Sequence, residues 1–207
     1  MPQNILSIVA DIGSVLPIFV VALIAITFHE AAHGFVAAAC GDDTAKRLGR
    51  VSLNPIRHID LVGTIILPAV LYLIHSPFLF GWAKPVPVDW TKLRHFKRDM
   101  MLVAAAGPAA NFALAAVSGA LFYGGFHYAA PQWMMTALST SVAFNLILGV
   151  FNLIPIPPLD GSKVLAGLLP EKWALRLLGF GRRRNTLKWH RQPAPTDSPD
   201  SKPDQGV

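Results

Sequence analysis

Charged residues are scarce in this sequence. Asp, Glu, Lys and Arg make up 14% of its 207 residues, whereas a typical soluble domain carries about 25%. Hydrophobic residues make up 53%, and the mean hydropathy is +0.44. Such an excess of apolar residues is too large for one soluble core, so the composition predicts an integral membrane protein.

Cysteine and glutamate are rarer still. The single cysteine, Cys40, excludes a disulfide within the chain. Glutamate occurs at two positions, Glu30 and Glu171, so the surroundings of each are informative. The first residues, MPQN, lack the basic residues that open a signal peptide. We therefore expect the apolar run that follows them to remain in the protein as a membrane segment.

The formal net charge of +6 arises from short basic blocks that lie between apolar runs. Basic blocks beside hydrophobic segments are typical of the cytoplasmic loops of membrane proteins. A nucleic-acid surface would instead combine basic and aromatic residues on one face. The sequence shows no such alternation, so no nucleic-acid partner is expected.

Three apolar segments are long enough to cross a bilayer: Pro17–Ala39, Met100–Tyr123 and Thr136–Leu153. The first would extend about 34 Å as a helix, which exceeds the hydrocarbon thickness of a membrane. Ser14 is predicted to cap a helix that begins near Pro17. Small residues in the second segment, around AAAGPAAN, would let another helix approach closely.

The basic blocks also predict the orientation of the chain. Residues 42–63, residues 84–98 and the region after 161 are basic, so all three should lie on the cytoplasmic side. The apolar segment 64–80 would then enter the membrane and return, with the N-terminus outside and the C-terminus inside. We expect one membrane domain at 1–180 and a basic, then polar, disordered tail at 181–207.

His29, Glu30 and His33 form the pattern H-E-x-x-H within the first apolar segment, where a long apolar run ends. On a helix, His29 and His33 lie on one face, so both imidazoles can bind one Zn²⁺. Glu30 then lies beside them as a base for metal-bound water. The alternative is a polar cluster at the membrane interface, but ionisable groups within an apolar helix usually face partners or a cavity.

A catalytic zinc needs a third protein ligand and one open position. Cys40 would lie about 10 Å further along the helix than His33, so it cannot share the metal and is interpreted as a packing residue. His58 and Asp60 lie in the polar loop that follows. Loop structure is the favoured interpretation for both, and gating of the site is the alternative.

Asp160 is the remaining candidate, in the stretch PPLDG after the third apolar segment. By itself, an Asp-Gly pair usually marks a turn, or a cap for a helix that begins near Gly161. However, Pro155, Pro157 and Pro158 force an extended backbone just before it. Non-helical backbone at membrane depth is tolerated where it is buried in protein or lines a cavity. This context favours an Asp160 side chain that points into a site.

Together, FHEAAHG, AAAGPAANF and FNLIPIPPLDGSKVL resemble the site-2 protease family of intramembrane zinc metalloproteases. LGRVSLNPIRHIDLVGT and FGWAKPVPV are similar to the compact bacterial branch of that family. The resemblance spans about residues 15 to 170. It implies zinc held by His29, His33 and Asp160, with Glu30 as the catalytic base. It also places Asn152 near the site, where its amide could bond the substrate backbone or the oxyanion; capping of its own helix is the alternative.

The resemblance implies an all-α integral membrane fold with three spanning helices around a buried zinc site, a re-entrant apolar segment and short membrane-associated strands. An extended strand from 44–60 or 81–88 would hold the substrate by edge pairing. One departure from the family is that the chain turns basic and polar from Arg182, where relatives usually continue with an apolar segment.

The implied function is a zinc-dependent endopeptidase of a bacterial inner membrane, which cleaves membrane-protein or peptide substrates in the lipid bilayer. A membrane zinc-binding or transport protein without proteolytic activity is the alternative. Glu30 distinguishes the two, because storage or transport needs no unligated base beside the metal. A structural membrane protein with a chance motif is a further alternative, and bound zinc would exclude it.

Overall fold

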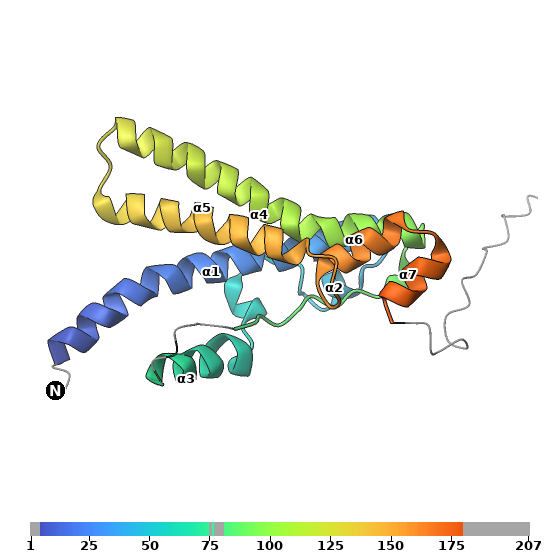
Figure 1. Ribbon diagram of the computed structural model, residues 1–207, viewed down its shortest axis with the longest axis horizontal. Helices are drawn as coiled ribbons and strands as arrows, with labels where there is room; N and C mark the ends of the chain where they lie inside the picture. The colour runs from blue at the N-terminus through green and yellow to red at the C-terminus, as the bar shows by residue number, and fades with distance from the viewer. Residues whose placement is uncertain (1–4, 75, 77–80, 180–207) are drawn as a thin grey trace, which may run out of the picture.

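The computed structural model describes residues 5–74, 76 and 81–179. Three long helices dominate this part of the chain: α1 (Ile5–Ala39), α4 (Phe96–His127) and α5 (Gln132–Asn152) (Figure 1). Each holds a segment long and apolar enough to cross a membrane, namely Pro17–Ala39, Phe96–His127 and Gln132–Asn152. For the described residues, the prediction of a helical fold with three helices that could span a membrane is therefore confirmed.

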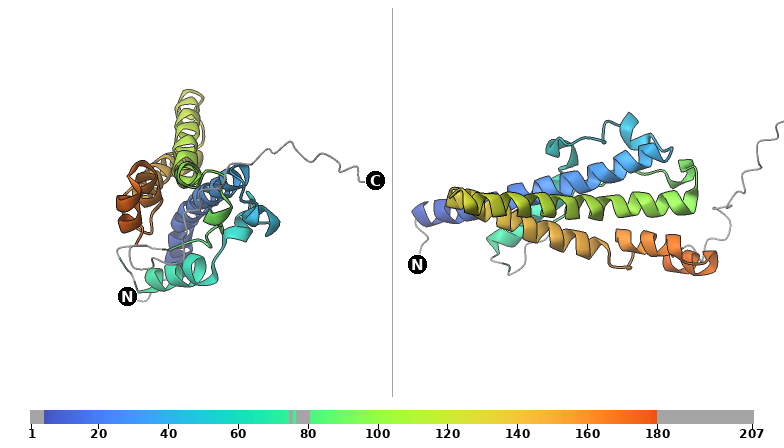
Figure 2. Two further views of the ribbon diagram at one scale, coloured as in Figure 1. Left: turned by 90° about the vertical axis from the view of Figure 1, so that its right-hand side faces the viewer. Right: turned by 90° about the horizontal axis from the view of Figure 1, so that it is seen from above.

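Helix α4 lies at the centre of the bundle. It forms an antiparallel hairpin with α5 and also packs against α1 (Figures 1 and 2). The buried face of α4 includes the small residues Ala104, Gly107, Ala115 and Ser118. Between helices in lipid the hydrophobic effect supplies little attraction, so close packing of small residues and hydrogen bonds must hold them together.

Shorter elements flank the long helices, most of them toward the end of the bundle opposite the α4–α5 turn (Figure 1). They are α2 (Thr44–Arg47), the 3₁₀ turns η1 (Pro55–His58) and η3 (Trp90–Lys92), the π-helical segment η2 (Leu61–Ile66), α3 (Leu67–Leu73), α6 (Asp160–Leu168) and α7 (Glu171–Leu177). Helix α6 packs against α4. A small apolar core joins this end of the molecule; its buried members are Ala37, Leu93, Met100, Val103, Ala166 and Ala174.

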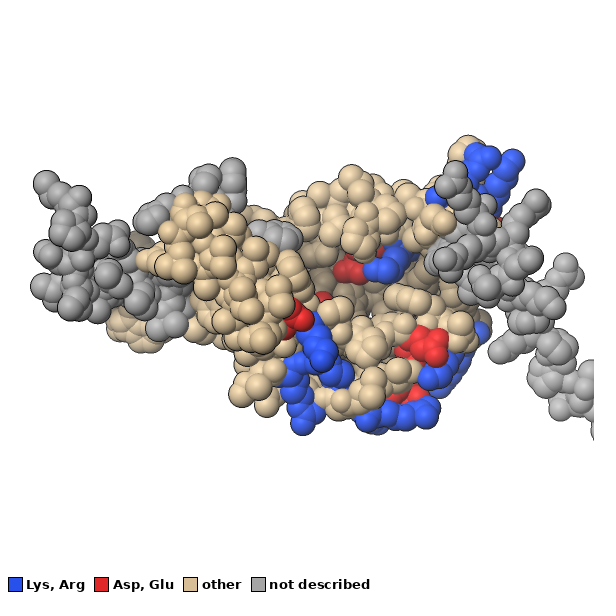
Figure 3. Space-filling model, turned by 90° about the horizontal axis from the view of Figure 1, so that it is seen from below, with Lys and Arg blue, Asp and Glu red and all other residues tan. Residues whose placement is uncertain are grey.

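Formal charges gather toward that end of the molecule (Figure 3). The sequence between Asp99 and Asp160 contains no Asp, Glu, Lys or Arg, and it forms most of α4 and all of α5. The α4–α5 hairpin therefore presents an apolar surface that suits lipid, while the charged end suits the aqueous side of a membrane.

The predicted start of the first helix is wrong. Helix α1 begins at Ile5, and Pro17 lies inside it rather than at its beginning. A proline removes one backbone donor, and the helix continues on both sides of that missing bond. Ser14 therefore does not mark a helix start.

The predicted re-entrant segment, 64–80, is only partly described. Residues 61–73 form a short apolar helix from η2 and α3, about 20 Å long at 1.5 Å per residue, which is too short to cross a bilayer. Residues 75 and 77–80 lie outside the described residues, as does the predicted tail at 181–207. Re-entry and the tail therefore stay predictions.

The predicted membrane-associated strands are absent from the described residues. Region 44–60 contains α2 and η1 instead, and residues 81–89 are extended without a strand partner. In that segment, the backbone N–H groups of Trp82 and Lys84 donate to the carbonyls of Gly63 and His58, which belong to helical turns. Pro85 and Pro87 have no N–H, so a regular ladder cannot form through them.

Candidate metal and catalytic site

Three side chains from two distant segments meet beside α4. His29 and His33 come from α1, and Asp160 is the first residue of α6. The Nε2 atoms of the histidines lie 3.1 Å apart, and Asp160 Oδ2 lies 3.2 Å from His29 Nε2 and 3.1 Å from His33 Nε2. Ligands of a tetrahedral zinc with bonds of about 2.0–2.1 Å would be about 3.3 Å apart. The three atoms thus have the spacing of a zinc-ligand set.

The outer nitrogens of both imidazoles are engaged. His33 Nδ1 lies 2.7 Å from the Val103 carbonyl oxygen, and His29 Nδ1 lies 2.6 Å from Asn111 Oδ1. Both partners are acceptors, so each Nδ1 must donate. In a neutral imidazole, Nε2 then carries no proton, and two such nitrogens face an Asp160 carboxylate. Three acceptors directed at one point need a cation between them, so the residues present fit zinc.

Gly107 of α4 leaves the space that this cluster occupies. A Cβ atom at position 107 would lie 2.5 Å from His33 Nε2 and 2.6 Å from His29 Nε2. Contacts between such atoms are ordinarily 3.4 Å or more. Only glycine therefore lets α4 pass so close to the two histidines. The stretch AAAGPAAN was interpreted from sequence as a packing motif, and its contact with the histidines was missed.

Glu30 lies next to His29 in α1 and is half-buried. Its Oε2 atom accepts a hydrogen bond of 2.7 Å from the backbone N–H of Val86. The extended 81–89 segment is thereby held against α1. A second contact secures its end, because the Asp89 N–H donates to Asp42 Oδ2 at 2.6 Å. The carboxylate of Glu30 is fixed beside the ligand set without being part of it.

The second oxygen of Asp160 has its own partner. Lys163 Nζ lies 3.0 Å from Asp160 Oδ1, which leaves Oδ2 directed at His29 and His33. The Lys163 ammonium favours the ionised form of the Asp160 carboxyl. A carboxyl group binds a metal in that ionised form.

The alternative role of Asp160 as a helix cap is not what the structure shows. Helix α6 begins at Asp160 itself, and its N-cap position, Leu159, makes no side-chain capping bond. Gly161 explains the Asp-Gly pair differently, because a Cβ there would lie 2.1 Å from the Leu153 carbonyl oxygen. Glycine lets the start of α6 fold back against the end of α5.

Asn152 is the last residue of α5. Its Nδ2 atom donates to the carbonyl oxygen of Leu148 in the same helix, at 3.0 Å. The structure therefore shows a bond within the helix, and a role for Asn152 toward substrate stays a prediction.

The loop candidates and Cys40 lie outside the metal-ligand set of the described residues. His58 is buried, and its Nε2 donates to the Ser52 carbonyl oxygen at 2.8 Å. Asp60 caps η2 by accepting bonds from two backbone N–H groups. Cys40 packs against the small apolar core. These contacts support loop structure for His58 and Asp60 and packing for Cys40.

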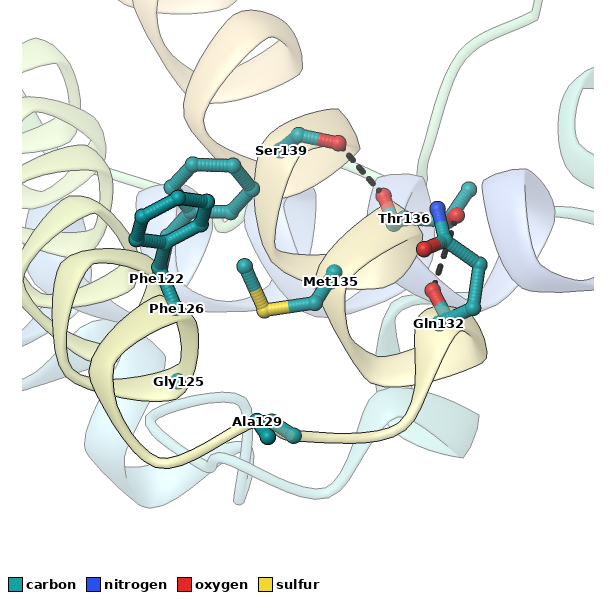
Figure 4. A pocket seen from close by; sticks show the side chains of 9 residues that line it. Phe122, Gly125, Phe126, Ala129, Gln132, Met135, Thr136 and Ser139 are labelled. Atoms are coloured by element: carbon teal, nitrogen blue, oxygen red, sulfur yellow. Dashed lines mark hydrogen bonds between the residues drawn. The ribbon is translucent and has the colours of Figure 1, made fainter.

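A separate pocket of about 510 Å³ lies at the α4–α5 turn (Figure 4). Phe122, Phe126 and Met135 point into it, and Thr136 and Ser139 lie on its α5 side. Phe122 is about 17 Å further along α4 than Asn111. The pocket is thus distant from the histidines, and neither His, Cys, Asp, Glu, Lys nor Arg lines it.

Comparisons with known proteins show what the chain is similar to. The family model described as peptidase family M50 matches residues 127–176. YwhC of Bacillus subtilis (strain 168), provisionally named a zinc metalloprotease, is 40% identical over 169 residues, which cover 76% of this chain and 71% of that protein. Rip2 of Mycolicibacterium smegmatis (strain ATCC 700084 / mc(2)155), named in the same way, is 30% identical over 146 residues, 69% of this chain and 53% of the relative.

No solved structure gives a significant match. The identity to YwhC extends over most of both chains, and the matched family adds the class of reaction. The chain therefore belongs to peptidase family M50, the site-2 protease family, and is a multi-pass membrane zinc metalloprotease.

Proposed function

We propose that this metalloprotease hydrolyses peptide bonds in or near transmembrane segments, within a bacterial inner membrane. The main support for this proposal is the position of the candidate zinc ligands along the candidate membrane span. His29 lies about 18 Å along α1 from Pro17 and about 15 Å from Ala39, and these residues bound the candidate span. A site near the middle of a spanning helix is suited to substrates that themselves lie in the membrane.

His29, His33 and Asp160 are proposed to hold the zinc ion, which leaves one position open for water or substrate. When bound, zinc supplies Lewis acidity, which activates water and polarises a peptide carbonyl. The protein's share is to keep the three ligands in place. Val103 and Asn111 hold the imidazoles, and Lys163 holds the Asp160 carboxylate.

Glu30 is proposed as the general base. The Val86 N–H holds Oε2, which leaves Oε1 as the oxygen that takes the proton of the attacking water. The same oxygen can then deliver that proton to the nitrogen of the leaving amine. Because the bond to Val86 fixes the carboxylate, little reorganisation is needed when the proton moves.

Asn152 is proposed to assist by hydrogen bonding to the substrate backbone or to the developing oxyanion. Its amide would have to exchange the Leu148 carbonyl for the substrate. The substrate must also change, because a peptide bond inside a helix is hydrogen-bonded and shielded. Local unwinding of the substrate near the site is therefore part of the proposal.

Glu30→Gln tests this function. We expect the variant to keep zinc and its fold in detergent but to lose cleavage of membrane-spanning peptides by about 100-fold or more, because an amide cannot accept the proton. Glu171→Gln is the matched control, since it makes the same change at an exposed position in α7 and should cleave normally. Cleavage by Glu30→Gln at the wild-type rate would refute the assignment of the base.

A further inference from the structure

Two buried asparagines stand behind the candidate zinc ligand His29. Asn111 of α4 is 0% exposed and Asn145 of α5 is 1% exposed. Asn111 Nδ2 lies 2.9 Å from Asn145 Oδ1, while Asn111 Oδ1 lies 2.6 Å from His29 Nδ1. We propose that Asn145 is a positioning residue for His29, acting through Asn111. This inference rests on the proposed role of His29 as a zinc ligand.

The direction of each hydrogen bond follows from the backbone of α5. Asn145 Nδ2 lies 2.9 Å from the Ser141 carbonyl oxygen, which can only accept. The Asn145 amide must therefore donate to Ser141, and its Oδ1 faces Asn111. That oxygen also only accepts, so Asn111 presents its NH₂ group to Asn145 and its oxygen to His29. A second acceptor, the Ala25 carbonyl 3.3 Å from Asn111 Nδ2, favours the same orientation.

The orientation of Asn111 selects the tautomer of His29. With Oδ1 facing His29, Nδ1 carries the proton and Nε2 has a free lone pair for the metal. If the Asn111 amide turned over, its oxygen would face two acceptors and its NH₂ would face Nδ1. The proton would then be placed on Nε2, which could not bind a metal. Asn145 opposes that reversal from a different helix.

A purely structural role is the competing explanation, because interhelical hydrogen bonds also hold membrane helices together. The same α4–α5 interface offers a matched control. Ser118 Oγ and Ser141 Oγ lie 2.8 Å apart, and Ser118 is buried. Ser118→Ala removes an interhelical hydrogen bond about 10 Å further along α4 than Asn111. It leaves in place the Ser141 carbonyl and hydroxyl oxygens, which lie 2.9 Å and 3.3 Å from Asn145 Nδ2.

Zinc affinity separates the two explanations. The dissociation constant would be measured in detergent by competition with a chromophoric chelator, together with thermal unfolding. Asn111→Leu should weaken zinc binding about 10- to 100-fold, as removal of such outer partners generally does. Asn145→Leu should weaken it less, by roughly 5- to 10-fold. Ser118→Ala should lower thermal stability while leaving the zinc affinity unchanged.

The double variant gives the sharpest outcome. If Asn145 acts only through Asn111, Asn111→Leu/Asn145→Leu should bind zinc no more weakly than Asn111→Leu alone. Additive losses, or wild-type zinc affinity in Asn145→Leu, would overturn the proposal. Asn145→Ala replaces the leucine variant if that one does not fold. Failure of the metal site itself is distinguishable, because zinc would then be absent from wild type or retained by His29→Ala.

Discussion

Gly107→Ala is the most direct test of the packing that surrounds the zinc site. The added Cβ would lie 2.5 Å from His33 Nε2 and 2.6 Å from His29 Nε2. To restore ordinary contact, the rings or α4 must move by roughly 0.9 Å, whereas zinc–ligand distances tolerate about 0.2 Å. The rings cannot swing freely, since their Nδ1 atoms are held at 2.7 Å by Val103 and at 2.6 Å by Asn111.

The size of the effect follows from the cost of overpacking. Inserting a methyl group into a well-packed site costs about 1–3 kcal/mol. If that cost falls on the zinc-binding conformation, the dissociation constant should rise roughly 5- to 150-fold. Peptide cleavage at limiting zinc should fall in parallel, because the same geometry serves binding and chemistry.

Gly124→Ala is the matched control for this variant. Gly124 lies in the same helix, and a Cβ there meets no atom within 4 Å. Alanine is a better helix former than glycine by up to about 1 kcal/mol, so this control should be at least as stable as wild type and bind zinc normally. The assay is zinc competition in detergent for both variants. Gly107→Ala with an affinity within about twofold of wild type would show that the close approach of α4 to the histidines is wrong.

Two further predictions concern the third ligand and the topology. Asp160→Asn should lower the zinc affinity by about tenfold or more, since a neutral amide oxygen is a poorer ligand than a carboxylate. Normal zinc content in this variant would show that Asp160 is a turn residue and not a ligand. Reporters fused after Arg57 and Arg94 should both report the cytoplasmic side and one after Gly125 the opposite side; opposite sides for Arg57 and Arg94 would show that residues 64–80 cross the membrane.

The part of the site that lies within one helix could be predicted from the sequence. Positions 29 and 33 share a face of any helix because the repeat is 3.6 residues. The apolar residues on both sides of the motif predict that this segment is a helix. Asp160 is different, since no local rule brings it 127 positions back to His33. Its placement depends on α4 packing against both α1 and α6. From the sequence, the prolines before Asp160 and the family resemblance are what indicate its role.

Asn111 and Asn145 were missed for a related reason. An amide within an apolar helix signals a partner, but the sequence does not say which of the other helices supplies it. Asn111 meets His29 only because α1 and α4 cross at that level, and Asn145 meets Asn111 only through the α4–α5 register. A general rule on buried polar groups could have identified both as candidates, although not the order in which they connect.

In the extended 81–89 segment, prolines at alternate positions remove the N–H donors that a strand needs along one edge. Alternate residues of an extended chain direct their N–H and C=O groups to the same side. The N–H groups of Trp82, Lys84 and Val86 face the protein and are engaged there. On the opposite edge, Pro85 and Pro87 present carbonyl groups but no N–H, and the Pro85 carbonyl oxygen lies 3.4 Å from Arg50 Nη2. The pattern looks like a strand because the segment is extended and holds two β-branched residues, Val86 and Val88. Its outer edge, however, can accept hydrogen bonds and scarcely donate them. Alternation of this kind prevents edge-to-edge pairing, while the inner edge still fixes Glu30.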